Sequence, residues 1–196
     1  AADLRGRTSK LAERINTAFW MEHEGWYAQA LDGRKARVAA IASNAGQLLF
    51  SGVVPPDRAE TMARRLLQPD LFSGWGLRTL STAMPRYDPL SYHNGSIWPH
   101  DNGIVADGLY ATGHPQVAEA IFGGMIGLAA GDSMAELYSG EPGEGPPLPA
   151  PGACRPQAWA AGVMPQLVRS CLRLRPDGES LVVDPALPSF LDRVVI

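Results

Sequence analysis

The sequence lacks several features that would assign a function at once. It has no P-loop, dinucleotide-binding fingerprint or serine nucleophile elbow. No apolar run approaches the roughly 20 residues of a membrane span, and no charged-then-apolar leader opens the chain. The net charge of −3 supplies no basic excess for nucleic acid or an anionic membrane. We therefore expect neither nucleic acid nor a membrane as a partner.

Cysteine is scarce as well. Cys154 and Cys171 are the two cysteines, and they form no C-x-x-C pair. This usage favours free thiols in a reducing compartment, with a disulfide as the less favoured alternative. We therefore expect a cytoplasmic protein, although residue 1 is alanine, so the missing leader adds little to that expectation.

Apolar periodicity predicts a mostly helical protein. Hydrophobic residues make up 45% of the 196 residues, enough to build the core of one domain. Helical spacing or proline starts predict six helices, at about 3–20, 35–49, 56–68, 99–111, 114–128 and 156–173. A short strand or extended arm is expected at 26–31, short strands at 181–183 and 194–196, and loops at 70–96 and 139–152. The predicted fold class is all-α with a small β appendage.

Residues 87–110 are the most informative stretch. They combine aromatic rings with hydrogen-bonding side chains: Tyr92, His93, Asn94, Trp98, His100, Asp101 and Asn102. Gly95 permits a bend, and Pro99 suits the first position of a helix, where its missing N–H costs nothing. Neutral, hydroxyl-rich ligands require such an apolar floor with a few directed polar groups. We interpret the stretch as a ligand-binding loop, with an aromatic plug for the core as the alternative.

Two carboxylates are candidates for acid–base chemistry. Glu136 stands beside apolar neighbours and two residues before Tyr138. Glycosidic bonds are cleaved by a pair of carboxyl groups, so Glu136 fits one of these roles, and a surface glutamate is the alternative. Asp101 is the second candidate, or it simply favours the positive end of a helix. His93, His100 and Asp101 are also metal-ligand types, but Pro99 interrupts their helical spacing, so we expect no metal ion and no cofactor.

Four segments together resemble a known family. Residues 92–102, which read YHNGSIWPHDN, are similar to the sugar-site motif of bacterial amylo-α-1,6-glucosidase (glycogen debranching) type proteins. Residues 43–49, 71–79 and 153–162 resemble the same family in the same order. The similarity runs along almost the whole chain, which makes it more specific than any one motif.

The resemblance implies an (α/α)6 barrel and hydrolysis of α-glycosidic bonds with inversion. Inversion requires two carboxyl groups about 6.5–9.5 Å apart, to leave room for water. Residues 134–140 match the segment that carries the family's general base, so the resemblance assigns this role to Glu136. Ala135 and Tyr138 depart from the usual Pro-Glu-Leu-Phe pattern there. The implied glucose-sized subsite, and so the implied carbohydrate substrate, would be bound by Trp75, Tyr92, His93, Trp98, His100, Asp101, Gln157 and Trp159.

The family's general acid has no counterpart in the sequence. It is an aspartate in a Gly-Trp-Lys-Asp-like segment, and residues 25–27 do not match that segment. Six predicted helices are also about half of a twelve-helix barrel. We therefore expect residues 1–196 to be the C-terminal half of the barrel domain, with a β appendage at about 180–196 and the acid in an upstream part of the same polypeptide. A non-catalytic carbohydrate-binding or scaffold module on the same fold is the alternative.

Overall fold

The computed structural model describes residues 2–131, 133–141 and 145–195. The described helices are α1 (Ala2–Ala18), α2 (Leu48–Ser51), α3 (Pro56–Leu66), α4 (Pro99–Ala111), α5 (Pro115–Ala129), α6 (Ala158–Ala161) and α7 (Val163–Cys171). A 3₁₀ helix, η1 (Ser43–Gln47), leads directly into α2. In the described part of the chain, no helix is both long enough and apolar enough to cross a membrane.

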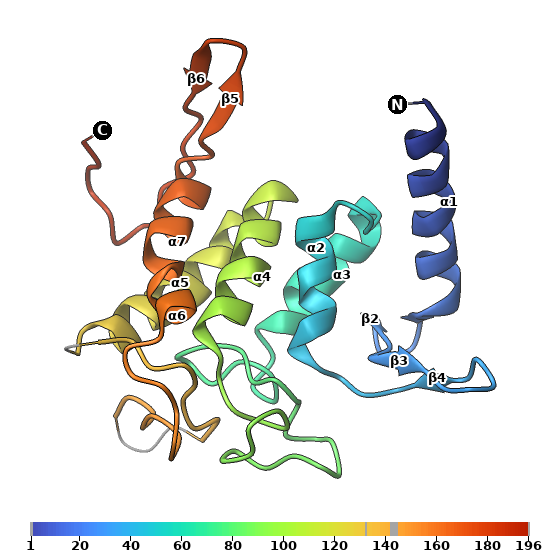
Figure 1. Ribbon diagram of the computed structural model, residues 1–196, viewed down its shortest axis with the longest axis horizontal. Helices are drawn as coiled ribbons and strands as arrows, with labels where there is room; N and C mark the ends of the chain where they lie inside the picture. Colours follow the sequence, from blue (N-terminus) through green and yellow to red (C-terminus); the bar gives the residue numbers. More distant parts are fainter. Residues whose placement is uncertain (1, 132, 142–144, 196) are drawn as a thin grey trace.

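Helix α4 lies at the centre of the fold. It contacts α5, α7, α2 and η1, and most of its residues are buried (Figure 1). Pro99 begins the helix and Pro115 begins α5, as predicted. Gly108 lets α2 approach closely, because a Cβ at this position would lie 2.7 Å from the Cβ of Leu49. The helical packing therefore fixes the first turn of α4, which carries His100 and Asp101.

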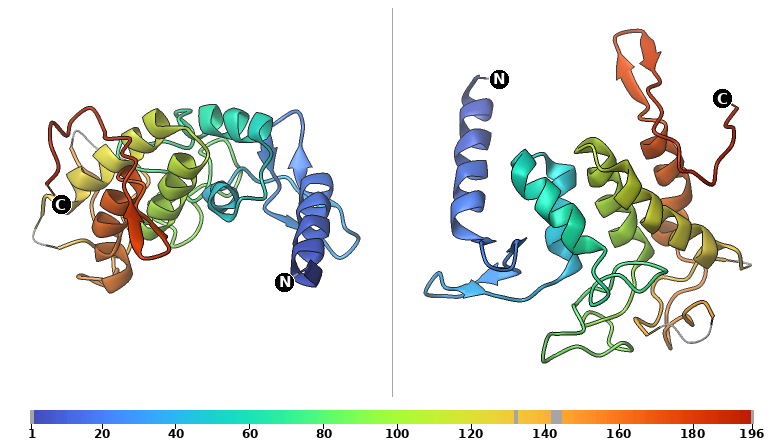
Figure 2. Two further views of the ribbon diagram at one scale, coloured as in Figure 1. Left: turned by 90° about the horizontal axis from the view of Figure 1, so that it is seen from above. Right: turned by 180° about the vertical axis from the view of Figure 1, so that it is seen from behind.

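The helices are arranged so that the long loops gather at one end. The segment 67–98 and the described parts of 130–157 (130–131, 133–141 and 145–157) lie beyond the same ends of α4, α5 and α7, at the bottom of Figure 1 and of the right-hand view in Figure 2. The hairpin of β5 (Arg175–Asp177) and β6 (Ser180–Val182) projects from the opposite end. The described residues form no closed ring of helices (Figure 2). The loop end therefore collects the segments in which we expect the site.

The strands are short and pair two by two. In addition to β5–β6, β1 (Trp20–Met21) pairs with β2 (Trp26–Tyr27), and β3 (Ala30–Leu31) pairs with β4 (Arg37–Val38), all antiparallel. The single strand or extended arm predicted at 26–31 is thus divided into two strands, β2 and β3, which pair with different partners. Residues 194 and 195 form no strand, and residue 196 of that prediction lies outside the described residues.

Two helix predictions need correction. Residues 35–49 form β4, an extended segment, η1 and the start of α2, because Ser43 and Gln47 of η1 bind the side chain of Asp101 instead of continuing an apolar helix face. Residues 156–173 form α6 and α7, separated at Gly162. The helices predicted at 3–20, 56–68, 99–111 and 114–128 are confirmed within about two residues at each end.

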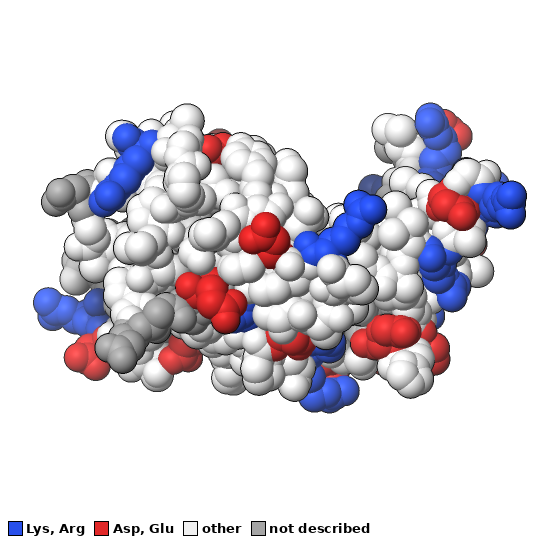
Figure 3. All heavy atoms as spheres, turned by 90° about the horizontal axis from the view of Figure 1, so that it is seen from below, with Lys and Arg blue, Asp and Glu red and all other residues white. Residues whose placement is uncertain are grey.

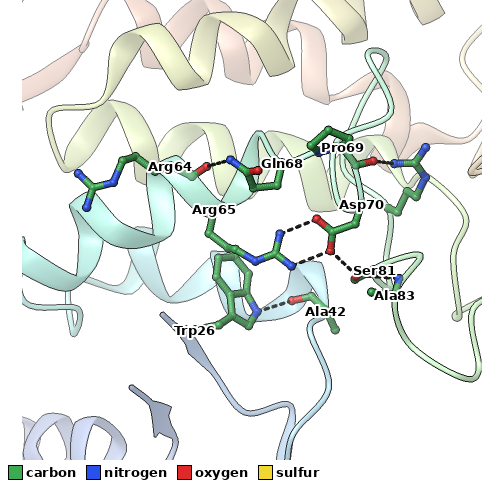
Figure 4. A network of polar contacts seen from close by, with 10 residues as sticks. Trp26, Ala42, Arg64, Arg65, Gln68, Pro69, Asp70, Ser81 and Ala83 are labelled. Carbon is green, nitrogen blue, oxygen red and sulfur yellow. Dashed lines mark hydrogen bonds and ion pairs between the residues drawn. The ribbon is translucent and has the colours of Figure 1, made fainter. Parts of the chain in front are cut away.

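A polar network fixes the loop that follows α3 (Figure 4). Arg65 donates two hydrogen bonds to Asp70, at 2.7 and 2.6 Å, and the Ser81 hydroxyl donates a third to the same carboxylate. Burial alone would raise the pKa of Asp70, but the hydrogen bonds from Arg65 and Ser81 outweigh it, so the pKa is lowered. Arg78 donates from Nη1 to the carbonyl oxygen of Pro69 at 2.9 Å. The network ties the loop to α3 before the chain reaches the site.

Helix α1 is the least covered of the described helices. None of its residues 3–18 is buried, and Leu4 and Leu11 are 62% and 54% exposed. In both views of Figure 2 it lies at the edge of the molecule, where β1 connects it to the rest. Its apolar side thus has few partners among the described residues.

Candidate active site

Backbone pairing joins the two loops that carry the predicted site residues. Ile97 and Tyr138 exchange two backbone hydrogen bonds of 2.9 Å, and Ile97 also bridges to Arg78. The backbones at Gly95 and Gly140 approach so closely that a Cβ on Gly140 would overlap the carbonyl of Gly95. The segments 92–101 and 134–141 therefore form one layer over the helix ends.

Glu136 is held from two sides in this layer. The hydroxyl of Tyr92 donates to Oε1 at 2.7 Å, and the backbone N–H of Cys154 donates to Oε2 at 3.3 Å. The backbone N–H of Glu136 in turn donates to the carbonyl of Cys154 at 3.0 Å. The hydrogen bond to Glu136 is the main cause of a raised pKa at Tyr92, which keeps the phenol protonated and able to donate. The carboxylate is half-buried and oriented, so it is not a free surface glutamate.

An aromatic cluster lies next to Glu136. The ring centroid of Trp98 is 4.7 Å from Tyr92 (edge to face), 5.7 Å from His93 (stacked) and 5.2 Å from His100 (edge to face). His100 also stacks on Trp159 at 3.9 Å, with an angle of 16° between the rings. Trp98 is 9% exposed, whereas Tyr92 and Trp159 are 50% and 60% exposed. The cluster thus has a buried floor and two accessible rings, an arrangement that suits the apolar face of a sugar.

A hollow of about 310 Å³ opens beside this cluster. This volume is at the lower end of the range for small-molecule sites. The hollow is lined by Gln29, Ala42, Ser43, Asn44, Gln47, Thr79, His93, Trp98, His100 and Asp101. Most of these groups are neutral hydrogen-bonding side chains, so the lining matches a ligand rich in hydroxyl groups.

Asp101 forms the charged part of the lining. It is 6% exposed and accepts hydrogen bonds from Ser43 Oγ and Gln47 Nε2, both at 2.5 Å. Burial raises the pKa of its carboxyl, and the neutral donors and nearby His100 only partly oppose this. Asp101 lies in the first turn of α4, as predicted, but its side chain connects α4 to η1.

The pKa of His100 is shifted in the opposite direction from that of Asp101. Burial lowers the pKa of its imidazole, although the charges of Asp101 and Glu136 oppose the shift. Its Nδ1 atom is buried and has no hydrogen-bond partner among the described residues. A neutral imidazole with one free ring nitrogen can bind a sugar hydroxyl.

Two predicted positions lie differently from the expectation. The Trp75 ring packs on α5, where a Cβ on Gly127 would overlap it, so the structure does not bring it into the aromatic cluster. Gln157 caps α6, because its Oε1 accepts from the backbone N–H of Ala160 at 3.0 Å.

Some residues that line the hollow are not among those predicted from the sequence. Ser43, Gln47 and Thr79 lie in two of the four segments that resemble the family, so a signal for them existed. Gln29 follows β2 and carried no sequence signal. Within the described residues, no group of three or more His, Cys, Asp or Glu side chains is arranged to hold a metal ion.

The surface at the loop end carries little organised charge. Viewed from this end, acidic and basic side chains are scattered over a largely uncharged surface (Figure 3). Neither sign forms a broad patch on this face, so its electrostatics favour a neutral ligand over a polyanion.

A helical array with a carboxylate among aromatic rings at its loop end is the arrangement expected of a glycoside hydrolase, and comparison with known proteins gives the same class. The chain belongs to the mannosylglycerate hydrolase MGH1-like glycoside hydrolase domain family, whose model matches residues 1–160. The predicted resemblance is thus confirmed at the level of a glycoside hydrolase domain. The family match does not extend to the amylo-α-1,6-glucosidase type.

The individual relatives are remote and longer than this chain. Mannosylglycerate hydrolases MGH1 and MGH2 of Selaginella moellendorffii are each 26% identical over 163 residues, which cover 83% of this chain and 32% of those proteins. The chain therefore spans about a third of the length of the curated relatives it matches.

Solved structures show the fold. The GH63 mannosylglycerate hydrolase from Thermus thermophilus in complex with glucose aligns with a TM-score of 0.62 and 20% identity, over 78% of this chain and 35% of that one. The neutral trehalase Nth1 from Saccharomyces cerevisiae gives 0.62 and 15%, over 81% and 29%. Both have the (α/α)6 fold, of which the described residues contain a helical part.

Proposed function

We propose that this chain is the base-carrying part of the catalytic domain of an inverting glycoside hydrolase that cleaves an α-glycosidic bond. The observation that carries the proposal is the fixed carboxylate of Glu136, held by Tyr92 and by the Cys154 backbone beside the aromatic cluster. An oriented, accessible carboxylate next to a sugar-sized hollow is what a general base for water requires.

In the proposed reaction, Glu136 takes a proton from a water molecule as that water attacks the anomeric carbon. A carboxylic acid upstream of this chain protonates the leaving oxygen, and the two groups lie roughly 6.5–9.5 Å apart so that the water fits between them. The hydrogen bond from Tyr92 fixes one carboxylate oxygen of Glu136. The other oxygen, which receives only the longer bond from Cys154, faces the water.

The sugar occupies the hollow and the adjoining rings. Its apolar face stacks on Trp98 or Trp159, and its hydroxyl groups bind His93, His100 and Asp101. Tyr92 serves as a positioning residue for Glu136 as well as a wall of the subsite. Trp75 and Gln157 shape the subsite from outside the hollow, by packing on α5 and by capping α6.

For the substrate, we favour a small α-linked mannosyl or glucosyl glycoside, by analogy with the relatives named for mannosylglycerate. An α-1,6-linked glucosyl branch is the alternative, which is supported by the four segments that resemble debranching enzymes. A panel of mannosylglycerate, glucosylglycerate and α-1,6-branched oligosaccharides tests the two directly. Cleavage of only the branched substrates would replace our choice.

The test of the chemistry is Glu136→Gln in the full-length protein. We expect kcat to fall by about a thousandfold, because an amide cannot accept the proton, whereas sugar binding persists. Glu141→Gln is the matched control, since Glu141 is hydrogen-bonded to Tyr87 away from the hollow and should keep near-normal turnover. Normal turnover of the Glu136 variant would end the proposal. Saturable sugar binding without turnover by the wild type on any substrate would favour the non-catalytic carbohydrate-binding module.

A further inference from the structure

A second hollow lies at the opposite end of α4 from the candidate active site. Its volume is about 360 Å³. It is lined by Asp107, Tyr110, Ala111, Gly113, Arg169, Ser170, Arg173, Arg175 and Asp184. Asp101 lies in the first turn of α4 and Tyr110 in the last, so the two hollows are about 14 Å apart along the helix. A ligand here would not reach Glu136.

Two residues that line this hollow each carry a buried donor that has no acceptor among the described residues. Tyr110 is 3% exposed, and its Oη has no hydrogen-bond partner in the part of the chain that the structure describes. The same is true of the buried Nε of Arg173. Burial raises the pKa of Tyr110, so its hydroxyl keeps the proton that it would donate. Leaving such donors unpaired is costly, which makes an acceptor in this hollow favourable.

The surrounding charges favour an acceptor that is also an anion. Three guanidinium groups, of Arg169, Arg173 and Arg175, face only two carboxylates in the lining. Arg169 pairs closely with Asp107 at 2.6 Å, but Arg173 reaches Asp184 at only 3.4 Å. Within the lining, the donors therefore exceed the acceptors, and the side chains carry a net positive charge. Glu119, whose charge also acts on Tyr110, lies outside the lining and accepts hydrogen bonds from Ser189.

The ends of two helices do not cancel this charge. The last turns of α4 and α7 face the hollow, and free carbonyl groups there would repel an anion. However, backbone N–H groups already bind several of these carbonyls, including those of Leu109, Arg169 and Cys171. The helix ends are thus partly capped, and the arginines determine the sign of the hollow.

We propose that this hollow binds a small oxyanion, a phosphate-type or carboxylate group that accepts hydrogen bonds from Tyr110 and Arg173 while Arg169 and Arg175 flank it. The inference does not depend on the proposed glycosidase activity. Two bonds from fixed donors give orientation, and the guanidinium groups give charge-assisted strength.

Calorimetric titration of the full-length protein at low ionic strength tests this site. Inorganic phosphate, sulfate and malonate serve as probes, so that tetrahedral and planar oxyanions are compared. We expect saturable binding that weakens with added salt. Arg173→Met should weaken binding at least about tenfold and Tyr110→Phe about fivefold. Arg64→Met is the matched control, because Arg64 is an exposed arginine paired with Glu60 outside the hollow, and should leave affinity unchanged.

Each outcome decides for or against the site. Absence of saturable binding, or equal affinity in the wild type and in both variants, would overturn the proposal. A crystal structure grown in phosphate that holds only water between Tyr110 and Arg173 would do the same. Circular dichroism checks folding, and if Tyr110→Phe unfolds, Arg173→Met alone decides. Glycoside turnover should stay normal in Arg173→Met, so a failure here is distinct from a failure of the active-site proposal.

Discussion

Asp70 and Asp101 are two carboxylates in similar surroundings whose pKa values are shifted in opposite directions. Each is largely shielded from solvent and accepts a hydrogen bond from a serine, Ser81 or Ser43. Asp70 also faces the guanidinium of Arg65, and its pKa is lowered. Asp101 faces the amide of Gln47 in place of a cation, and burial raises its pKa.

The difference distinguishes a carboxylate that anchors a loop, Asp70, from one that is available to bind a ligand, Asp101. A cation beside a buried carboxylate satisfies its charge and makes the pair a fixed support, as it does for the loop after α3. A buried carboxylate with only neutral donors keeps an unmet demand for hydrogen bonds, which an incoming ligand can satisfy. A ligand in the hollow could reach the Asp101 carboxylate, because Asp101 is part of the lining.

Among the variants that test this comparison, Asp70→Asn should have the largest effect, which is a loss of stability. The amide removes the anion from Arg65, and we expect a loss of about 2–3 kcal/mol in the free energy of unfolding. Urea denaturation of the full-length protein measures it. Asp57→Asn, an exposed carboxylate in the first turn of α3, is the control and should lose about 0.5 kcal/mol or less. A loss no larger than that of the control would show that Asp70 is not an anchor.

Asp101→Asn should give the opposite pattern. Ser43 and Gln47 can each reverse their hydrogen-bonding role, so the free energy of unfolding should change by less than about 1 kcal/mol. Sugar affinity should fall about tenfold, because a charge-assisted hydrogen bond becomes a neutral one. Calorimetry with the substrate analogue measures this. A destabilised variant with unchanged affinity would make Asp101 a second anchor.

Tyr92→Phe probes how Glu136 is positioned. Loss of one hydrogen bond to the carboxylate should lower kcat about fivefold to tenfold and change KM little. Tyr87→Phe is the control, because Tyr87 donates a comparable bond to Glu141, and its kcat should stay normal. Equal rates in the two variants would remove the positioning role from Tyr92.

The smallest effect is the pH dependence of stability. The folded-state pKa of Asp101 is raised above 3.8, so its contribution is present below pH 3.8 and is lost as pH rises through the folded pKa. The folded-state pKa of Asp70 is lowered, so its contribution is present above pH 3.8 and is lost as pH falls through the folded pKa. Urea midpoints over pH 2–7 should lose the first slope in Asp101→Asn and the second in Asp70→Asn. The reverse assignment would contradict the comparison.

The sequence predicts those parts of the fold that depend on local rules. Pro99 and Pro115 mark the starts of α4 and α5, and apolar spacing defines α3. It fails where a distant partner decides, as at 35–49, where Ser43 and Gln47 turn toward Asp101 across 58 and 54 residues of sequence.

The candidate site likewise contains residues that local sequence patterns mark and residues that only tertiary contacts place. The stretch around Tyr92 and Trp98 stands out by composition, and the structure brings it to Glu136. Trp75 is a tryptophan like Trp98, but its backbone and its ring pack against two glycines of α5, Gly124 and Gly127. Gln29 reaches the hollow only because β2 and β3 place it there, and no local pattern marks it.

Ile97 gives the loop end an unusual mechanical property. This one residue pairs with Arg78 on one edge and Tyr138 on the other, and it is fully buried. A displacement of any of the three chain segments would be transmitted to the other two at a single junction. Evolution can therefore lengthen the outer parts of these loops to accept new ligands, whereas an insertion at the junction would shift Glu136 and the aromatic rings together.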